Sequence, residues 1–338
     1  VIRMPPDSRT PVTSPAPRKL GLRQLAFWLT CFAPGAGALV ACVLRPDRLA
    51  ALVVIPTWIW MVFAGPSLLW ALRSRRRSIA IVLMASWSVF AVGWVEEISS
   101  LARGTWRSLA GITASSTVRV VSLNCANTIR CVEDLQAVSP DIVLLQETPG
   151  RDDLLLMTQR LFGPEGSVLI GIDTAILARG VIRPAEIPVP GMATSGIVEL
   201  SGMPPVHCIC LRRTPPVARL DFWTREFWGD HQRLREHHRE ELTAVLAGFS
   251  QVESCFLRIV GGDFNAPPLD PTLGVLASAG LTDAFAGQGV GLGGTGTNDY
   301  PLFRVDQIWT DSRVSQAFAR KTKYSDHRMV VSDLIHSP

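Results

Sequence analysis

The chain has few charged residues for its length. Asp, Glu, Lys and Arg make up 18% of its 338 residues, whereas soluble proteins typically have roughly 25%. The shortage is uneven. Residues 1–116 hold 13 Lys or Arg and 4 Asp or Glu, a net charge of +9, whereas residues 117–338 hold 20 and 25, a net charge of −5. A basic, apolar front and a mildly acidic back indicate two regions that face different solvents.

Two further shortages narrow the possible functions. The seven cysteines are an odd number and show no CxxC or Cys/His spacing, so the sequence indicates no zinc site. Cys208 and Cys210 lie two residues apart on a strand-like run, so their side chains point to the same face and could come into contact. Burial as two small apolar side chains is the favoured interpretation. Beyond the short cluster at 320–323, residues 117–338 contain no basic run, which counts against a nucleic-acid-binding face.

Long uncharged stretches are confined to the front of the chain. Residues 25–44 and 49–72 carry no charge, and residues 79–95 form a shorter third stretch. A bilayer core needs about 20 helical residues, so these stretches predict three transmembrane helices, with several tryptophans as interface anchors. Residues 1–24 are predicted to be a disordered basic tail, and residues 96–117 a linker.

The basic residues of the front region predict its orientation. They gather in the tail before the first span and in the RSRRR loop at 73–77. Because short cytoplasmic loops are enriched in Lys and Arg, we expect the tail and this loop to be cytoplasmic. Three spans then place residues 118–336 outside the cytoplasm, as the extracytoplasmic domain of a multi-pass protein of the cell membrane.

Residues 118–336 are predicted to form one α/β domain. Runs of β-forming residues recur, often in adjacent pairs with few helices between them. This pattern favours a layered α/β sandwich over a doubly wound parallel sheet. The longest predicted helix covers 228–249. Its three histidines do not share a face at i, i+4 spacing, so we expect a solvated helix surface rather than a metal site (His231, His237 and His238).

Five short polar motifs follow apolar runs in this domain. They read SLNCAN (122–127), DIVLLQE (141–147), VGGDFN (260–265), RVDQIW (304–309) and YSDH (324–327). Each brings an Asn, Glu, Asp or His to the end of a run of β-formers, so strands lying side by side would gather these groups on one rim. A rim of carboxylates, carboxamides and an imidazole is what metal-assisted phosphoester hydrolysis requires.

Three residues are the first candidates for this chemistry. Glu147 can ligate a divalent cation, although it also fits a turn before Pro149. Asp263 can orient or deprotonate the attacking water, and Asn265 can donate to a phosphate oxygen. The alternative for this pair is an Asx turn followed by two prolines.

Four more residues complete the candidate site. Asn124 can hold a carboxylate or a phosphate oxygen, or simply form a strand-end turn. His327 can stabilise charge on the phosphate as an imidazolium, with Asp306 as the acid that fixes its tautomer and raises its pKa. Asp326 is a candidate second metal contact. In isolation, the SDH sequence that carries His327 favours a surface turn.

Together these motifs resemble the endonuclease/exonuclease/phosphatase family over residues 118 to about 335, in the family's order. The resemblance implies a four-layer α/β/β/α sandwich with Mg²⁺ or Mn²⁺ at the rim of the sheets. It implies that Glu147 is the metal ligand, assisted by Asn124, and that Asp263 activates water while Asn265 contacts the phosphate. It further implies that Asp306 pairs with His327, and that Asp326 lies near the metal.

The sequence departs from the family at one position. Many members have a His in a His-Thr-Pro-Pro segment, where this chain has Arg213 followed by Thr-Pro-Pro and preceded by Arg212; His207 lies too early on its strand. An arginine stays charged and cannot act as a general acid, but it can clamp a phosphate. The departure therefore predicts phosphate binding by Arg212 or Arg213 and a leaving group that needs little protonation, such as that of a phosphoanhydride. Asp173 is a further candidate at the rim.

Three spans before such a domain resemble the membrane-anchored branch of this family, to which the teicoplanin-resistance membrane phosphatase belongs. The resemblance implies hydrolysis of a lipid-linked phosphate or pyrophosphate of the undecaprenyl type, with a membrane lipid as the partner. Two alternatives remain open: an anchored extracytoplasmic nuclease or phosphodiesterase, which the net charge of −5 disfavours, and a catalytically degenerate binding module.

Overall fold

Most of the chain after residue 38 is described by a computed structural model, which covers residues 21, 35–37, 39–73, 77–110, 117–186, 193–216, 219–251 and 257–335. The predicted disordered tail lies outside the described residues except for Gly21. The larger part of the predicted first span also lies outside them.

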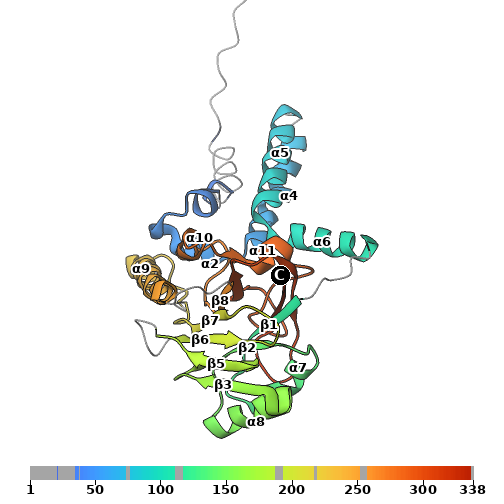
Figure 1. The fold of residues 1–338 in the computed structure, drawn as a ribbon. Coiled ribbons are helices and arrows are strands. Elements are labelled where there is room, and N and C mark those ends of the chain that lie inside the picture. Colours follow the sequence, from blue (N-terminus) through green and yellow to red (C-terminus); the bar gives the residue numbers. More distant parts are fainter. Residues whose placement is uncertain are drawn as a thin grey trace, which may run out of the picture.

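Residues 117–335, which we call the catalytic domain after the hydrolytic site predicted for it, contain two six-stranded mixed sheets (Figure 1). The first has the order β11-β12-β1-β2-β4-β3, and the second has the order β5-β6-β7-β8-β10-β9. The strands are β1 (Thr117–Asn124), β2 (Ile142–Gln146), β3 (Gly166–Ile170), β4 (Thr174–Arg179), β5 (Val181–Pro184), β6 (Ala193–Glu199), β7 (Val206–Arg212), β8 (Leu257–Asp263), β9 (Thr282–Asp283), β10 (Asp306–Thr310), β11 (Val314–Arg320) and β12 (Met329–Ile335).

Helices cover the outer faces of the two sheets. Figure 1 shows α7 and α8 beside the first sheet, and α9 and α10 at the second. The helices of this domain are α7 (Val132–Gln136), α8 (Arg151–Phe162), α9 (Arg225–Ala247), α10 (Gly274–Ser278) and α11 (Ala284–Gln288). The predicted α/β sandwich is therefore confirmed.

The alternation of strand side chains explains why three apolar layers form. In β2, Ile142 and Leu144 point into the core between the sheets, whereas Val143 and Leu145 pack in the core that includes α7 and α8. A separate core joins the outer face of β7 and β8 to α9 and α10. Buried thiols of Cys208 and Cys210 lie in the core between the sheets, as expected for small apolar residues.

The front region contains helices α2 (Ala50–Val54), α3 (Thr57–Trp60), α4 (Ala64–Arg73), α5 (Arg77–Trp94) and α6 (Glu96–Ala110). Figure 1 shows α4 and α5 projecting from the catalytic domain. Within the described residues, only α5 is by itself long and apolar enough to cross a membrane, with 17% of its residues buried. This agrees with the predicted stretch at 79–95. A shorter apolar helix covers Gly35–Leu44.

The prediction of one continuous helix over 49–72 is wrong. The helical segments Asp47–Val54 and Thr57–Arg73 meet at an angle of 86°. The cause is Pro56, because a proline disfavours helical backbone in the residue before it, and Ile55 is indeed extended. Length and composition allow this bent pair to be a broken span or a re-entrant segment.

The segment expected as a linker begins with a helix docked on the catalytic domain. Only Val95 separates α5 from α6. Glu96 at the start of α6 accepts two hydrogen bonds of 2.7 Å from Arg304, which is also paired with Asp283. Farther along α6, Arg103 donates to the carbonyl of Gly289 at 2.8 Å. The end of the apolar region is thus attached to the catalytic domain rather than separated from it.

Candidate active site

Strand register brings the candidate side chains to one edge of the two sheets. Arg212 on β7 lies opposite Asp263 on β8, and Asp263 lies opposite Asp306 on β10. In the other sheet, Asn124 at the end of β1 lies beside Gln146, the residue before Glu147. Because directly opposed residues point to the same face, the second sheet aims a guanidinium and two carboxylates at the end of the first sheet.

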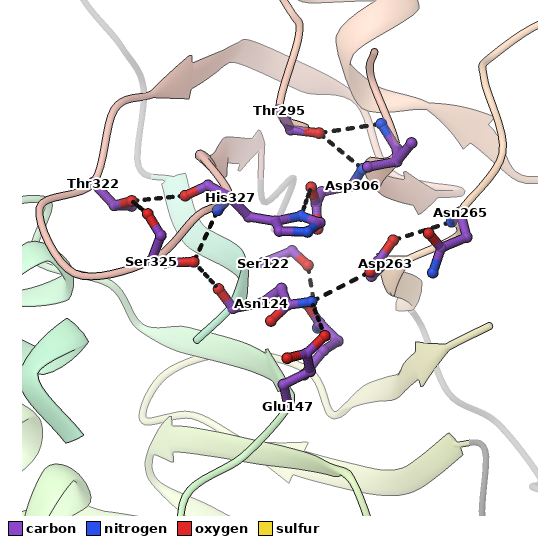
Figure 2. Close-up of polar contacts among 12 residues, drawn as sticks. Ser122, Asn124, Glu147, Asp263, Asn265, Thr295, Asp306, Thr322, Ser325 and His327 are labelled. Atoms are coloured by element: carbon purple, nitrogen blue, oxygen red, sulfur yellow. Dashed lines mark hydrogen bonds and ion pairs between the residues drawn. The ribbon is translucent and has the colours of Figure 1, made fainter. Parts of the chain in front are cut away.

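Asn124 connects the two sheets at this edge. Its Nδ2 lies 2.9 Å from Oε1 of Glu147 and 3.3 Å from Oδ2 of Asp263 (Figure 2). Simple strand alternation would point Glu147 to the outer face with Leu145, but its backbone is left-handed, with φ of 46°. A left-handed non-glycine residue costs roughly 1–2 kcal/mol. This left-handed backbone at Glu147 is what turns its carboxylate into the site.

Asp263 is a buried carboxylate with a strongly altered acidity. It is 2% exposed, and its Oδ1 accepts a hydrogen bond from the backbone N–H of Asn265 at 3.0 Å. Burial, followed by the negative charge of Asp306, raises the pKa of Asp263 to about 7. A carboxylate with a pKa near neutrality is suited to accept a proton from water.

Asp306 and His327 form an ion pair next to Asp263. Nδ1 of His327 lies 2.8 Å from Oδ2 of Asp306, which is fully buried (Figure 2). Burial disfavours the charged imidazole, but the Asp306 carboxylate outweighs it and raises the pKa of His327 to about 9. His327 is therefore an imidazolium at neutral pH, as predicted from the pairing with an acid.

Two hydroxyl groups that were not among the candidate site residues hold this pair in place. Thr295 Oγ1 accepts from the backbone N–H of Asp306 at 3.0 Å, and Ser325 Oγ accepts from that of His327 at 2.9 Å. Ser325 also donates to the carbonyl of Asn124 at 2.6 Å, which attaches the last motif to the first (Figure 2). Ser325 stands in the SDH motif, whereas Thr295 lies in a glycine-rich loop with no recognisable signal.

The side chains of Arg212, the last residue of β7, and of Arg213, which follows it, point to opposite faces of the sheet. Arg212 donates to Glu147 at 2.6 Å and to Asp173 at 2.7 Å, so both predicted acids lie at the rim with it. Arg213 is 3% exposed, and its Nη1 lies 3.4 Å from Thr272 Oγ1. Burial lowers the pKa of the Arg213 guanidinium to about 10. Arg213 faces the layer of α9, so only Arg212 is available to a phosphate at the rim.

Other predicted residues are placed differently from the expected arrangement. The side-chain amide of Asn265 donates to the Arg213 carbonyl at 2.7 Å, so it must turn before it can contact a phosphate. Asp326 is exposed and does not belong to the described group of potential metal ligands. His207, by contrast, is not at the rim, as expected from its early place on the strand: it is buried and pairs with Ser195 at 2.8 Å. The three histidines of α9 were predicted to be solvated, and this prediction is wrong for His231 and His238, which are buried.

The residues at the rim fit a divalent cation. Potential ligand atoms of Asp263, Asp306 and His327 lie within 4.8 Å of one another, but with His327 protonated only the two carboxylates of this group are available to an ion. Asp306 Oδ1 is buried and has no hydrogen-bond partner among the described residues. When Asp263 is ionised, four carboxylates face two cations at the rim, which leaves an excess of two negative charges (Glu147, Asp173, Asp263 and Asp306 against Arg212 and His327). Oxygen donors with this charge suit a hard ion such as Mg²⁺.

A two-sheet sandwich with this rim defines the class of metal-dependent hydrolases that act on phosphoester bonds. The family model described as "Endonuclease/Exonuclease/phosphatase family" matches residues 121–327. The chain belongs to this family.

Solved structures share the fold at low sequence identity. The chain is similar to humanized D. rerio TDP2, with 18% identity, a TM-score of 0.50, and coverage of 66% of this chain and 100% of that chain. It is also similar to a family protein from Bacteroides thetaiotaomicron, with 15% identity, a TM-score of 0.50, and coverage of 67% and 100%. The comparison with curated proteins gives no match.

Proposed function

We propose that this protein is a membrane-anchored, extracytoplasmic phosphohydrolase that uses Mg²⁺ or Mn²⁺ to cleave a lipid-linked phosphate or pyrophosphate, of the undecaprenyl pyrophosphate type. The observation that carries the hydrolytic part is the rim where Asn124 links Glu147 to Asp263 beside the Asp306–His327 pair. The membrane part is supported by an apolar helix, α5, joined to the catalytic domain through a docked α6.

The charge state of the rim divides the roles among its residues. A protonated His327 cannot ligate a metal ion, because ligands must be deprotonated. We therefore assign the ion to Glu147, with Asn124 beside it, and proton transfer to Asp263. When bound, the ion supplies positive charge and orients a phosphate oxygen. Asp263 accepts the proton of the attacking water, and the His327 imidazolium stabilises negative charge on the phosphate oxygens.

The position of Arg212 favours a good leaving group. This guanidinium stands at the rim, between Glu147 and Asp173, where it can bind a phosphate. Because an arginine does not donate its proton to a departing alkoxide, a phosphoanhydride, which leaves as a phosphate, is the better substrate. This reasoning favours a pyrophosphate over a simple monoester.

Anchoring and orientation rest on the charge pattern of the front region. Three spans with a cytoplasmic tail place the catalytic domain outside the cytoplasm, and the bent pair around Pro56 then serves as the second span. A tether raises the effective concentration of a membrane-borne substrate. A reporter fused after Ser337 tests the orientation: we expect it to be active outside the cytoplasm, and cytoplasmic activity would refute the assignment.

The substrate is tested with the purified full chain and Mg²⁺. Undecaprenyl pyrophosphate and double-stranded DNA are offered in parallel, with Asp263→Asn as the inactive variant. Glu165→Gln, an exposed acid that lies with Thr117 and Asp141 at the opposite end of the first sheet, is the matched control. We expect phosphate release from the lipid that only Asp263→Asn abolishes. DNA nicking without phosphate release would instead identify an anchored nuclease, and inactivity on both would favour a binding module.

A further inference from the structure

A cavity of about 290 Å³ lies where the apolar front helices meet the catalytic domain. Its walls come from the break between α2 and α3, the end of α5, and two loops of the catalytic domain. Apolar side chains dominate the lining, among them Val53, Pro56, Val92, Leu269, Leu302 and Phe303. Ligand pockets are typically roughly 300–1,000 Å³, so this cavity is large enough for a segment of a hydrocarbon chain.

The catalytic loops form one wall of this cavity. Leu269 follows Asn265 by only four residues, and Phe303 precedes Asp306 by three. The backbone N–H of Phe264 donates to the carbonyl of Val305 at 2.9 Å, which holds the two loops together. Leu269 also packs against the apolar cluster of the front helices. These two loops therefore have acidic side chains at the rim, Asp263 and Asp306, and apolar side chains in the cavity wall, Leu269 and Phe303.

The polar groups of the lining select against an anion. Arg304 is paired with both Glu96 and Asp283, so its charge is already neutralised. Glu97 adds a further carboxylate, whose buried Oε2 has no hydrogen-bond partner in the described part of the chain. With three acids and one arginine, this lining repels a phosphate, which must stay at the rim. An uncharged hydrocarbon chain is not repelled by these carboxylates.

We propose that the junction cavity binds the hydrocarbon chain of the lipid phosphate whose head group is hydrolysed at the rim. The inference rests on the proposed function and adds the part of the protein that recognises the lipid. The cavity adjoins the end of α5, the helix best suited to the membrane, so a chain can enter from the apolar side. Specificity for a long-chain lipid then resides in the cavity, whereas cleavage resides at the rim.

Glycine substitutions provide a matched test. Gly93 lines the cavity, and a Cβ there would meet nothing within 4 Å. Gly93→Phe therefore causes no clash at its Cβ, and its ring adds bulk at the cavity wall. Gly65 on α4 is equally exposed and equally open but does not line the cavity, so Gly65→Phe is the control. Ala286→Phe, at an exposed position on the opposite wall, is a second variant in case Gly93→Phe folds poorly.

The full-length variants are assayed with Mg²⁺ on a long-chain polyprenyl pyrophosphate and on a short, water-soluble isoprenyl pyrophosphate. Each buried methylene contributes about a fourfold increase in affinity. If the added ring prevents several methylenes of the substrate from being buried in the cavity, the KM for the long-chain substrate should rise at least about tenfold. We expect less than about a twofold change on the short substrate, and no change for Gly65→Phe. Equal effects on both substrates, or none for either cavity variant, would overturn the inference. A wild-type protein inactive on both would refute the proposed function itself.

Discussion

Arg212 competes with a metal ion for Glu147, and its removal should therefore strengthen metal binding. Its Nη2 lies 2.6 Å from Oε1 of Glu147, the oxygen that Asn124 also contacts. A hydrogen bond to a charged group contributes roughly 1.5–3 kcal/mol. Because both side chains of the pair are about a quarter to a third exposed, at 30% and 25%, the lower value applies. About 1.4 kcal/mol is a tenfold change, so Arg212→Gln should bind Mn²⁺ about tenfold more tightly.

The assay is a Mn²⁺ titration followed by electron paramagnetic resonance, which needs no turnover. Arg183→Gln is the control, because Arg183 pairs with Glu199 at 3.0 Å, away from the rim. Added inorganic phosphate should increase Mn²⁺ affinity in the wild type, since phosphate draws the guanidinium from Glu147, and should do so much less in Arg212→Gln. Unchanged or weaker Mn²⁺ binding in the variant would show that Arg212 orients the ligand instead of competing with the ion.

Three other predictions follow from the same contacts. Asp263→Asn should lower kcat by about 10²–10⁴, the usual contribution of a general base, with thermal stability retained or increased, because it removes a buried carboxyl whose pKa is raised. In metal-free protein, the pKa of His327 is raised from 6.5 to about 9. The ion pair of the protonated imidazole therefore stabilises the fold fully below about pH 6.5, and this contribution is lost as the pH rises through 9. Denaturant titrations should show the loss in the wild type but not in His327→Gln. Arg304→Met leaves the buried Asp283 and the partly buried Glu96 without their ion-pair partner and should reduce the free energy of unfolding by about 3–5 kcal/mol. The exposed Arg313→Met should change it by less than about 0.5 kcal/mol, and equal effects in thermal melts would contradict the assigned ion pair.

The fold and the main site residues could be predicted because the relevant signals are local. A run of β-formers ending in a polar residue identifies both the strand and the group at its end, as with Asn124 and Asp263. The order of the five motifs then resembles one family. The orientation of Arg212 and Arg213 was not predictable, because neighbouring strand residues point to opposite faces and only the register with β8 determines which one reaches the rim.

Contacts between distant segments explain most of the remaining differences. Residues 96–117 were expected to be a linker, but Glu96 pairs with Arg304, which lies 208 positions away. Nothing in the local pattern near Glu96 indicates that partner. The bend before Pro56 is different, because its cause is local: the apolar run at 49–72 is long enough for one span, but the proline ends the first helical segment within it. A proline within an apolar run therefore indicates two helical segments.

The docking of α6 has a consequence for how this protein meets its substrate. A single residue, Val95, separates α5 from a helix that Arg304 and Arg103 fix to the catalytic domain. A one-residue connection to a docked helix leaves little freedom of movement. The rim therefore keeps a constant distance and orientation relative to the end of α5. With α5 in a bilayer, as proposed, substrates must arrive by lateral diffusion in the leaflet. The rate of hydrolysis should then follow the mole fraction of the lipid in the membrane and be insensitive to its total concentration in the sample.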